Sequence, residues 1–274
     1  MVLAAGALSS PRLLLASRSE AHPAGIGNGR DQIGRNLMFH LNEMFAYWPS
    51  RREAFVGAAK SVGFRDLYAH EGQRLGMVQA MGVEAGYREI LHLLRTRLAE
   101  RGLTGRLWRE AARIPAALAA RLVGEAKLFV GLMEDLPDPE NRVVLDPADP
   151  RRMRLTYTTA PEARHRRRLF RRLIGRAFKG RRVMFLSERA EPNLGHGCGT
   201  LRMGRDPATS ATDSTGRIHG MANLWVADAA SFPTSMGVNP SLTIAALALR
   251  QAQAISGALQ RDASPPDPAR KDAT

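Results

Sequence analysis

Hydrophobic and polar residues follow one another along this chain in patterns that predict both strands and helices. Residues 2–6 form a short apolar stretch that ends in glycine, which predicts a buried strand. The run Ser9-Ser10-Pro11 then supplies a cap and a proline for the first turn of a helix that contains Leu13, Leu14 and Leu15. A strand that turns into a helix at a glycine is typical of an α/β unit.

The middle of the chain predicts helices more than strands. Residues 20–50 are rich in glycine and predict irregular structure, whereas residues 51–135 predict mainly helix, with the clearest segments at 84–99 and 114–128. After Pro137 and Pro139 the pattern changes. It predicts strands at 142–145, 155–158 and 183–186 and a long amphipathic helix at 161–178.

The last third carries the clearest pattern. Residues 224–227 predict a buried strand that ends at Asp228, and the final helix is predicted to have Asn239 as its cap and Pro240 as its first residue. Residues 261–274 are polar and contain prolines, so we expect a disordered tail.

Composition makes this a soluble globular chain. Of 274 residues, 44% are hydrophobic and 24% are charged. The single cysteine, Cys198, excludes an intrachain disulfide. No stretch approaches the roughly 20 apolar residues of a membrane span, and the N-terminus lacks the basic leader of a signal peptide, so we expect no membrane span and a cytoplasmic location.

The positive charge is concentrated in one segment. The chain has 40 lysines and arginines against 26 acids, a formal charge of +14, and residues 151–182 hold 13 of these cations with one acid, Glu162. A row of arginines on one helix face binds phosphates. The simpler interpretation is a solvated helix whose apolar side packs on a sheet. Because no aromatic residues alternate with the arginines, we do not expect a nucleic-acid partner.

Two residue patterns in the last third favour catalysis or ligand binding. His196 lies in GHGCGTLRMG, where flanking glycines allow close approach to a substrate, and the usual pKa of histidine, near 6.5, suits a general base. A helix that starts at Asn239-Pro240 presents free N–H groups to an anion. The alternatives are a histidine held by an ordinary hydrogen bond and an ordinary helix cap.

Two further residues have a structural alternative of the same kind. Asp228 follows a buried strand, where α/β sheets place ligand-contacting groups, but it could equally cap the following turn. Cys198 and His196 are only two potential metal ligands, so no metal site is predicted and Cys198 is expected to be a small buried side chain.

These segments resemble the C-terminal part of the glucose–methanol–choline (GMC) family of FAD-dependent oxidoreductases. The main match runs from His196 to Arg250 and is HGCGTLRMGRDPATSATDSTGRIHGMANLWVADAASFPTSMGVNPSLTIAALALR. The opening VLAAGALSSPRLLLAS is similar to the second signature region of the family, and IGRNLMFH at 33–40 and NRVVLDP at 141–147 also fit. Residues 50–135 add little to the resemblance.

The resemblance implies a mechanism and a set of site residues. A substrate alcohol or polyol would lose its hydroxyl proton to His196 while its carbon-bound hydrogen leaves as hydride to the flavin, and Asn239 would orient the alcohol oxygen. It further implies contacts with FAD from Ala5, Gly6, Asp228, Ala229, Asn239 and Pro240. The substrate itself and the electron acceptor, whether oxygen, a quinone or a cytochrome, stay open.

The chain departs from the family in one large respect. The family begins with a strand, a GxGxxG turn and a helix that hold the FAD pyrophosphate, and no such motif occurs in this sequence. We therefore expect a fragment that carries the active-site part and lacks the nucleotide-binding unit. The alternatives are a non-catalytic basic binding module that uses residues 151–182, or an inert truncated product.

The resemblance implies an α+β fold, with an antiparallel sheet and packed helices in a substrate domain and pieces of an FAD-binding α/β domain whose Rossmann unit is absent. The expected division is a remnant of the FAD domain at 1–40, a substrate domain at 41–193, an active-site segment at 194–260 and the tail at 261–274.

Overall fold

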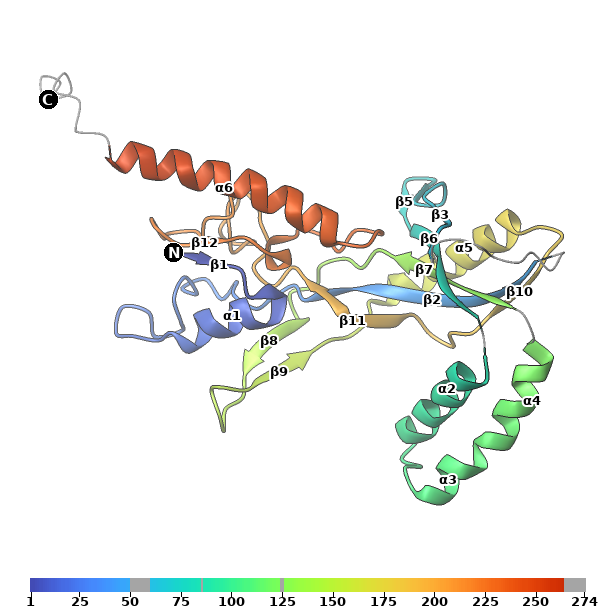
Figure 1. Cartoon of the computed structure of the whole chain (residues 1–274). Coiled ribbons are helices and arrows are strands. Elements are labelled where there is room, and N and C mark those ends of the chain that lie inside the picture. Colours follow the sequence, from blue (N-terminus) through green and yellow to red (C-terminus); the bar gives the residue numbers. More distant parts are fainter. Residues whose placement is uncertain (50–59, 85, 124–125, 264–274) are drawn as a thin grey trace, which may run out of the picture. The chain divides into compact units, whose positions relative to one another are not determined.

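The computed structural model describes residues 1–49, 60–84, 86–123 and 126–263. The chain divides into two compact units, each built from separate stretches of sequence (Figure 1). Unit 1 consists of residues 1–40, 134–160 and 193–274, and unit 2 consists of residues 41–133 and 161–192. Segments that are distant in the sequence therefore share one unit in both cases.

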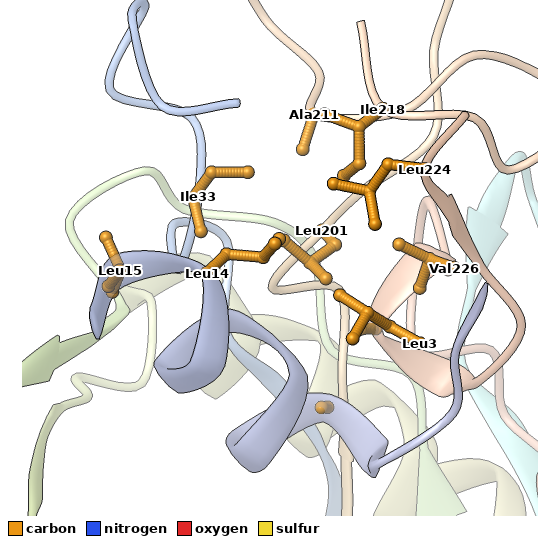
Figure 2. Packing of buried hydrophobic residues seen from close by; sticks show 11 residues of the cluster. Leu3, Leu14, Leu15, Ile33, Leu201, Ala211, Ile218, Leu224 and Val226 are labelled. Atoms are coloured by element: carbon orange, nitrogen blue, oxygen red, sulfur yellow. The ribbon is translucent and has the colours of Figure 1, made fainter. Parts of the chain in front are cut away.

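Unit 1 contains short strands and two long helices. Its elements are β1 (Val2–Leu3), α1 (Gly6–Ala16), β8 (Arg142–Leu145), β9 (Met153–Thr156), β12 (Trp225–Val226), the 3-10 helix η1 (Ala229–Ser231) and α6 (Ser241–Ala263). β1 pairs with β12 in parallel, with Val2 opposite Trp225. Leucine, isoleucine and valine side chains from both ends of the chain pack into one core, in which Leu14, Leu201 and Val226 meet (Figure 2).

Helix α1 contains a proline in its interior, and a side chain from the distant HGCGT segment compensates for it. Pro11 has no N–H to donate to the carbonyl of Ala7, one turn earlier. The hydroxyl of Thr200 donates to that carbonyl instead, at 2.6 Å. The buried carbonyl therefore keeps a partner, and the helix passes through Pro11 without losing it.

Unit 2 is built on an antiparallel sheet. Its strands are β2 (Met38–Trp48, the first three residues of which belong to unit 1), β3 (Gly63–Phe64), β6 (Gly76–Glu84), β7 (Lys127–Met133) and β10 (Arg182–Phe185). The order is β10-β2-β7-β6-β3, and β11 (Glu191–Cys198) also pairs with β2. A small hairpin of β4 (Ala69–His70) and β5 (Gln73–Arg74) stands apart.

Helix α5 (Pro161–Ala177) packs its apolar side on this sheet. Phe170, Leu173 and Ile174 are buried with Phe45 in one core. Gly131 on β7 makes the contact possible, because a Cβ atom at that position would lie 2.5 Å from the Phe170 ring. Helix α5 can lie this close to β7 because Gly131 has no side chain.

The remaining helices of unit 2 form a hairpin between β6 and β7 (Figure 1). They are α2 (Tyr87–Glu100), α3 (Arg106–Ala111) and α4 (Arg113–Val123). We call residues 87–123 the helical arm. Helix α2 contacts α4, and the only buried side chains of the arm are the small Ala112 and Ala116.

The α+β class predicted from the sequence is confirmed, with antiparallel sheets and packed helices. The strand at 142–145 and the helix from Pro161 are also confirmed, and α4 and α2 lie within a few residues of the predicted helices. Helix α1, however, begins at Gly6, five residues before the predicted proline start.

The middle of the chain corrects two predictions. Residues 20–50 were expected to be irregular, but β2 is an 11-residue strand. Residues 51–135 were expected to be mainly helical, but they hold β6 and β7, and β7 begins at Lys127, inside the segment predicted as helix 114–128. Strands β2 and β7 are buried on two faces over much of their length, so their residues do not alternate as those of a half-exposed strand would.

The C-terminal helix also differs from the prediction. It begins at Ser241, and the first helical hydrogen bond runs from the N–H of Ile244 to the carbonyl of Pro240. Pro240 therefore holds the cap position that the sequence assigned to Asn239. The helix continues to Ala263, so residues 261–263 are helical rather than disordered, and the rest of the predicted tail lies outside the described residues.

One segment of α6 corrects the expectation that no stretch has the composition of a membrane span. Residues Ser241–Gln260 are long and apolar enough to cross a membrane. The most apolar 18-residue stretch of this segment has a mean hydropathy of 1.2, and 6% of it is buried. This is a statement about length and composition alone. The core helices of soluble proteins can have the same length and composition.

Candidate active site

His196 lies on β11, and a neighbouring amide orients its ring. The side chain is half-buried, and its Nδ1 lies 3.2 Å from Nδ2 of Asn193. The N–H of Gly195 donates to Oδ1 of Asn193 at 3.2 Å, so the amide nitrogen is the atom that faces the histidine. This contact makes Nδ1 an acceptor and favours the neutral tautomer that carries its proton on Nε2.

His40, a residue that the sequence analysis did not single out, packs against His196. It is fully buried, and the two rings meet edge to face with their centroids 4.9 Å apart and an angle of 84° between them. Within the described part of the chain, neither ring nitrogen has a partner in good hydrogen-bonding geometry. The backbone of Met236 and of Val238 lies near the ring, on the side of the Asn239 loop.

The surroundings of His40 keep its ring neutral. Burial, which disfavours the charged form, is the main cause that lowers the pKa of His40 to about 4, and the charge of the adjacent His196 contributes to the same lowering. The nearby backbone of Met236 and Val238 acts in the opposite direction and is too weak to restore the usual value. The ring of His40 therefore stays neutral at neutral pH.

Asp135 ties together the segments that carry these residues. Its Oδ2 accepts hydrogen bonds from the N–H of Phe39 at 3.2 Å and from the hydroxyl of Tyr157 at 2.8 Å, and its own N–H donates to Oγ of Ser235 at 2.7 Å. The side chain is buried. A single carboxylate residue thus anchors the residue before His40 and the loop that leads to Asn239.

The same network raises two other pKa values. Burial is the main cause of the raised pKa of the Tyr157 hydroxyl, and the negative charge of Asp135 adds to it. Burial likewise raises the pKa of the Cys198 thiol, again with Asp135 as the second cause. Both groups stay protonated, so neither acts as an anionic base or nucleophile at neutral pH.

Asn239 lies in the loop before α6. Its side chain is exposed and Pro240 is half-buried. Met236 in the same loop has a backbone φ of 61°, a left-handed conformation that is uncommon for a residue with a side chain. Because this loop contacts His40 through its backbone and His40 contacts His196, the structure brings both predicted catalytic residues to one corner of unit 1.

The predicted FAD-contacting residues at the two ends of the chain also meet. Oδ2 of Asp228 accepts hydrogen bonds from the N–H of Gly6 at 2.9 Å and from the hydroxyl of Ser10 at 2.6 Å. Its Oδ1 accepts from the N–H of Ala230 at 2.7 Å and caps η1, in which Ala229 lies. Asp228 therefore does cap the following turn, and both oxygens of its carboxylate already accept hydrogen bonds from within the protein.

The turn at Ala5 and Gly6 offers a surface that a flat ring could approach. Gly6 has φ of +82°, which favours glycine, and a Cβ atom built there would meet nothing within 4 Å. Ala5 is exposed. The exposed backbone of this turn leaves room for a flat ring to approach.

Other features of the structure lie outside this corner. The described residues contain no group of His, Cys, Asp and Glu that could hold a metal ion. Cys198 is buried, as predicted, with its Sγ 3.7 Å from the carbonyl oxygen of Met38. A cavity of about 290 Å³ in unit 1 is lined by Arg30, Asp31, Gln32, Arg35, Asn36, Pro139, Arg202, Ala208 and Thr209, and none of these is a predicted site residue.

The basic helix α5, which carries the alternative binding function, uses several of its arginines inside the protein. Arg166 pairs with Glu162 and donates to the carbonyl of Arg74. Arg167 and Arg171 both pair with the buried Glu43. These contacts favour the interpretation of α5 as a structural helix with a solvated outer face.

Comparisons with known proteins identify the family. Residues 137–248 match the family model described as GMC oxidoreductase. The chain is 30% identical to paromamine 6'-oxidase of Streptomyces fradiae over 94% of its own length and 45% of that protein, and 28% identical to the fructose dehydrogenase large subunit of Gluconobacter japonicus over 95% and 47%. Residues 137–248 therefore belong to the GMC oxidoreductase family, and the chain as a whole is similar to part of the length of such proteins.

The fold agrees with this assignment. The crystal structure of a pyridoxine 4-oxidase of Mesorbium loti matches with a TM-score of 0.52 and 22% sequence identity, over 96% of this chain and 51% of that protein. The chain thus spans about half the length of the curated relatives that it matches.

The stretch IGRNLMFH fits the family, but no local sequence signal marks a role for its last residue, His40, or for Asn193, Asp135 or Tyr157. His40 is one of seven histidines and stands in an apolar run, which is the pattern of an ordinary buried histidine. Only the contact with His196 sets it apart.

Proposed function

We propose that this chain carries the active-site part of an FAD-dependent enzyme that oxidises the CH–OH group of an alcohol or polyol. The observation that carries the proposal is the His40–His196 contact beside the Asn239 loop, which combines a half-buried candidate base with a neutral buried partner. Relatives named for paromamine, for fructose and for 2-methyl-1,2-propanediol support a small hydroxylated substrate.

In this proposal His196 takes the hydroxyl proton of the substrate, and Asn239 orients the substrate oxygen. FAD, when bound, supplies the acceptor for the hydride that leaves the same carbon. Ala5, Gly6, Asp228, Ala229, Asn239 and Pro240 would hold the flavin, with Asp228 acting mainly by fixing the turn at Gly6.

The tautomer of His196 adds a condition. Because Asn193 donates to Nδ1, the neutral ring carries its proton on Nε2, and that nitrogen then donates rather than accepts. The nitrogen that receives the substrate proton is therefore Nδ1, after Asn193 has released it, or Nε2, after the ring proton has moved to Nδ1. His40 supports either course, since its edge-to-face contact holds the plane of the ring and its neutral state adds no opposing charge.

We further propose that the activity requires a nucleotide-binding part that this chain does not contain. The chain spans 45–47% of the length of its curated relatives. The exposed leucines of α6, with Leu242 83% and Leu249 70% exposed, offer an apolar face that such a part would cover.

Flavin binding and flavin reduction test the two parts of the proposal separately. The purified chain, mixed with FAD and passed through a desalting column, is expected to emerge without the flavin absorption bands. A yellow, stoichiometric complex would overturn the requirement for a further part. In an enzyme completed by that part, His196→Ala is expected to slow flavin reduction by roughly 10²–10⁴-fold. An unchanged rate would exclude His196 as the base.

A further inference from the structure

The helical arm of unit 2 carries a row of large apolar side chains on its outer face. Leu107, Ile114, Leu118 and Leu122 are 76%, 78%, 59% and 67% exposed. The last three are spaced four residues apart, so they fall on one face of α4, and Leu107 lies on the preceding helix α3. We call these four residues the apolar stripe.

The burial of α4 is inverted relative to that of an ordinary surface helix. A surface helix turns its large apolar residues inward and its small or polar residues outward. Here Ala112 and Ala116 are buried, whereas the apolar stripe faces solvent. Single exposed leucines need no explanation, but three large apolar side chains on one face of α4, with a fourth on the adjoining α3, indicate a surface that binds something apolar.

The charge of the arm indicates which kind of surface the apolar stripe binds. Residues 87–123 contain eight arginines and three glutamates, a net charge of +5. Arg106 and Arg109 on α3 and Arg113 and Arg121 on α4 are all exposed beside the apolar stripe, and Trp108 next to it is 44% exposed. Apolar residues on one face, arginines around them and a tryptophan at the border are the features of a helix that lies in a lipid interface.

We propose that the helical arm binds the surface of an anionic membrane, with the apolar stripe at the level of the acyl chains and the arginines at the headgroups. Contact between two copies through the same stripe would bring two surfaces of charge +5 together, which electrostatic repulsion disfavours. Anionic lipids instead attract each arginine near the surface. The inference rests on unit 2 alone and is independent of the proposed oxidoreductase activity.

Sedimentation with lipid vesicles tests the proposal on the full chain. We expect the chain to sediment with vesicles that mix phosphatidylcholine and phosphatidylglycerol, more weakly with phosphatidylcholine alone, and less at high salt. Ile114→Ser and Leu118→Ser should each weaken vesicle binding by about tenfold or more, because each removes a large apolar group that the membrane would bury. Arg106→Gln and Arg121→Gln should each weaken it about fivefold.

Matched variants elsewhere make the test specific. Leu242→Ser and Leu249→Ser replace equally exposed leucines on α6, the one described segment with the composition of a membrane span, and Arg172→Gln and Arg176→Gln replace exposed arginines on α5. These four variants should bind vesicles as the unaltered chain does, and circular dichroism should show that all variants are folded.

Three outcomes would overturn the proposal. One is vesicle binding that survives the substitutions in the apolar stripe. Another is vesicle binding that is lost through the α6 or α5 variants and not through the arm variants. The third is that substitutions in the apolar stripe change the molecular mass of the protein in solution, measured by light scattering, but leave vesicle binding unchanged. This result would indicate a contact between two copies of the chain.

Discussion

Strand β2 carries two buried polar side chains that have opposite surroundings. Glu43 is 2% exposed, and its two carboxylate oxygens accept from Arg167 and Arg171 of α5, the latter at 2.6 Å. His40 is fully buried, yet among the described residues neither ring nitrogen has a partner in good hydrogen-bonding geometry. The first residue belongs to unit 2 and the second to unit 1.

The difference separates a scaffold contact from a candidate site. A buried carboxylate with two guanidinium partners stabilises one arrangement of helix and strand. A buried imidazole with incomplete hydrogen bonding costs stability and is retained where the ring has another use. The edge-to-face contact with His196 supplies that use in the proposed function. The degree of hydrogen-bond satisfaction, more than burial, therefore distinguishes the two regions.

The largest expected effect on the free energy of unfolding is at Glu43, the residue of the scaffold contact. Glu43→Gln should lower the free energy of unfolding by about 3 kcal/mol, because it leaves Arg167 and Arg171 partly buried without their counter-charge. Urea unfolding measures the change. Glu110→Gln is the matched control: Glu110 pairs with Arg113 on the exposed arm, and its loss should cost about 1 kcal/mol or less. Equal losses in both variants would remove the distinction between them.

An effect of similar size is expected at His40, and it depends on pH. Because its pKa is lowered to about 4 in the folded chain, the unfolded chain binds the extra proton at any pH between about 4 and 6.5. The stability is therefore complete above pH 6.5 and falls as the pH falls toward 4, by about 3 kcal/mol for this residue.

Urea unfolding at several pH values checks this expectation. His40→Phe should remove most of the loss between pH 6.5 and pH 4, and His40→Gln should do the same if the larger ring does not fit. His165→Gln, at an exposed position on α5, should leave the pH dependence unchanged. A His40 variant with the full pH dependence of the unaltered chain would show that His40 is not the buried neutral histidine.

The smallest expected effect is at the neighbour of His196. Asn193→Asp should raise the midpoint of the His196 titration by about one pH unit, because a carboxylate in place of the amide favours a proton on Nδ1. The nitrogen chemical shifts of the ring, followed by NMR, report both the midpoint and the tautomer.

Asn193→Leu is the control, because it removes the amide without adding charge. It should leave the midpoint nearly unchanged while the tautomer preference disappears. A midpoint that does not move in Asn193→Asp would show that the 3.2 Å contact does not exist in solution.

The helix α5 and the helical arm extend the comparison to charge. Both are rich in arginine, and the sequence analysis gave weight only to the first, since residues 151–182 hold most of the excess charge. In the structure α5 buries its apolar face and pairs Arg166, Arg167 and Arg171 internally. The arm leaves its apolar stripe exposed, and its ion pair between Arg113 and Glu110 lies at the surface. Charge density alone therefore did not locate the surface that merits a binding test.

Much of unit 1 could be predicted from local sequence. The His196–Arg250 motif identified the family, and the strand before Asp228 and, to within one residue, the start of α6 follow from short-range signals of hydrophobicity and capping. The predicted cofactor-contacting residues Gly6 and Asp228 do meet, through a hydrogen bond of 2.9 Å. Their roles toward a flavin stay predictions.

The sequence by itself determined the family, the class of fold and His196 as the candidate base, because each depends on a contiguous motif or a local pattern. Only the tertiary structure decided that 38–48 is a strand and that His40 faces His196. The polar residues of that strand, His40 and Glu43, obscure its apolar pattern, and each is accommodated by residues more than a hundred positions away. Such long-range partners leave no signal in the local order of residues.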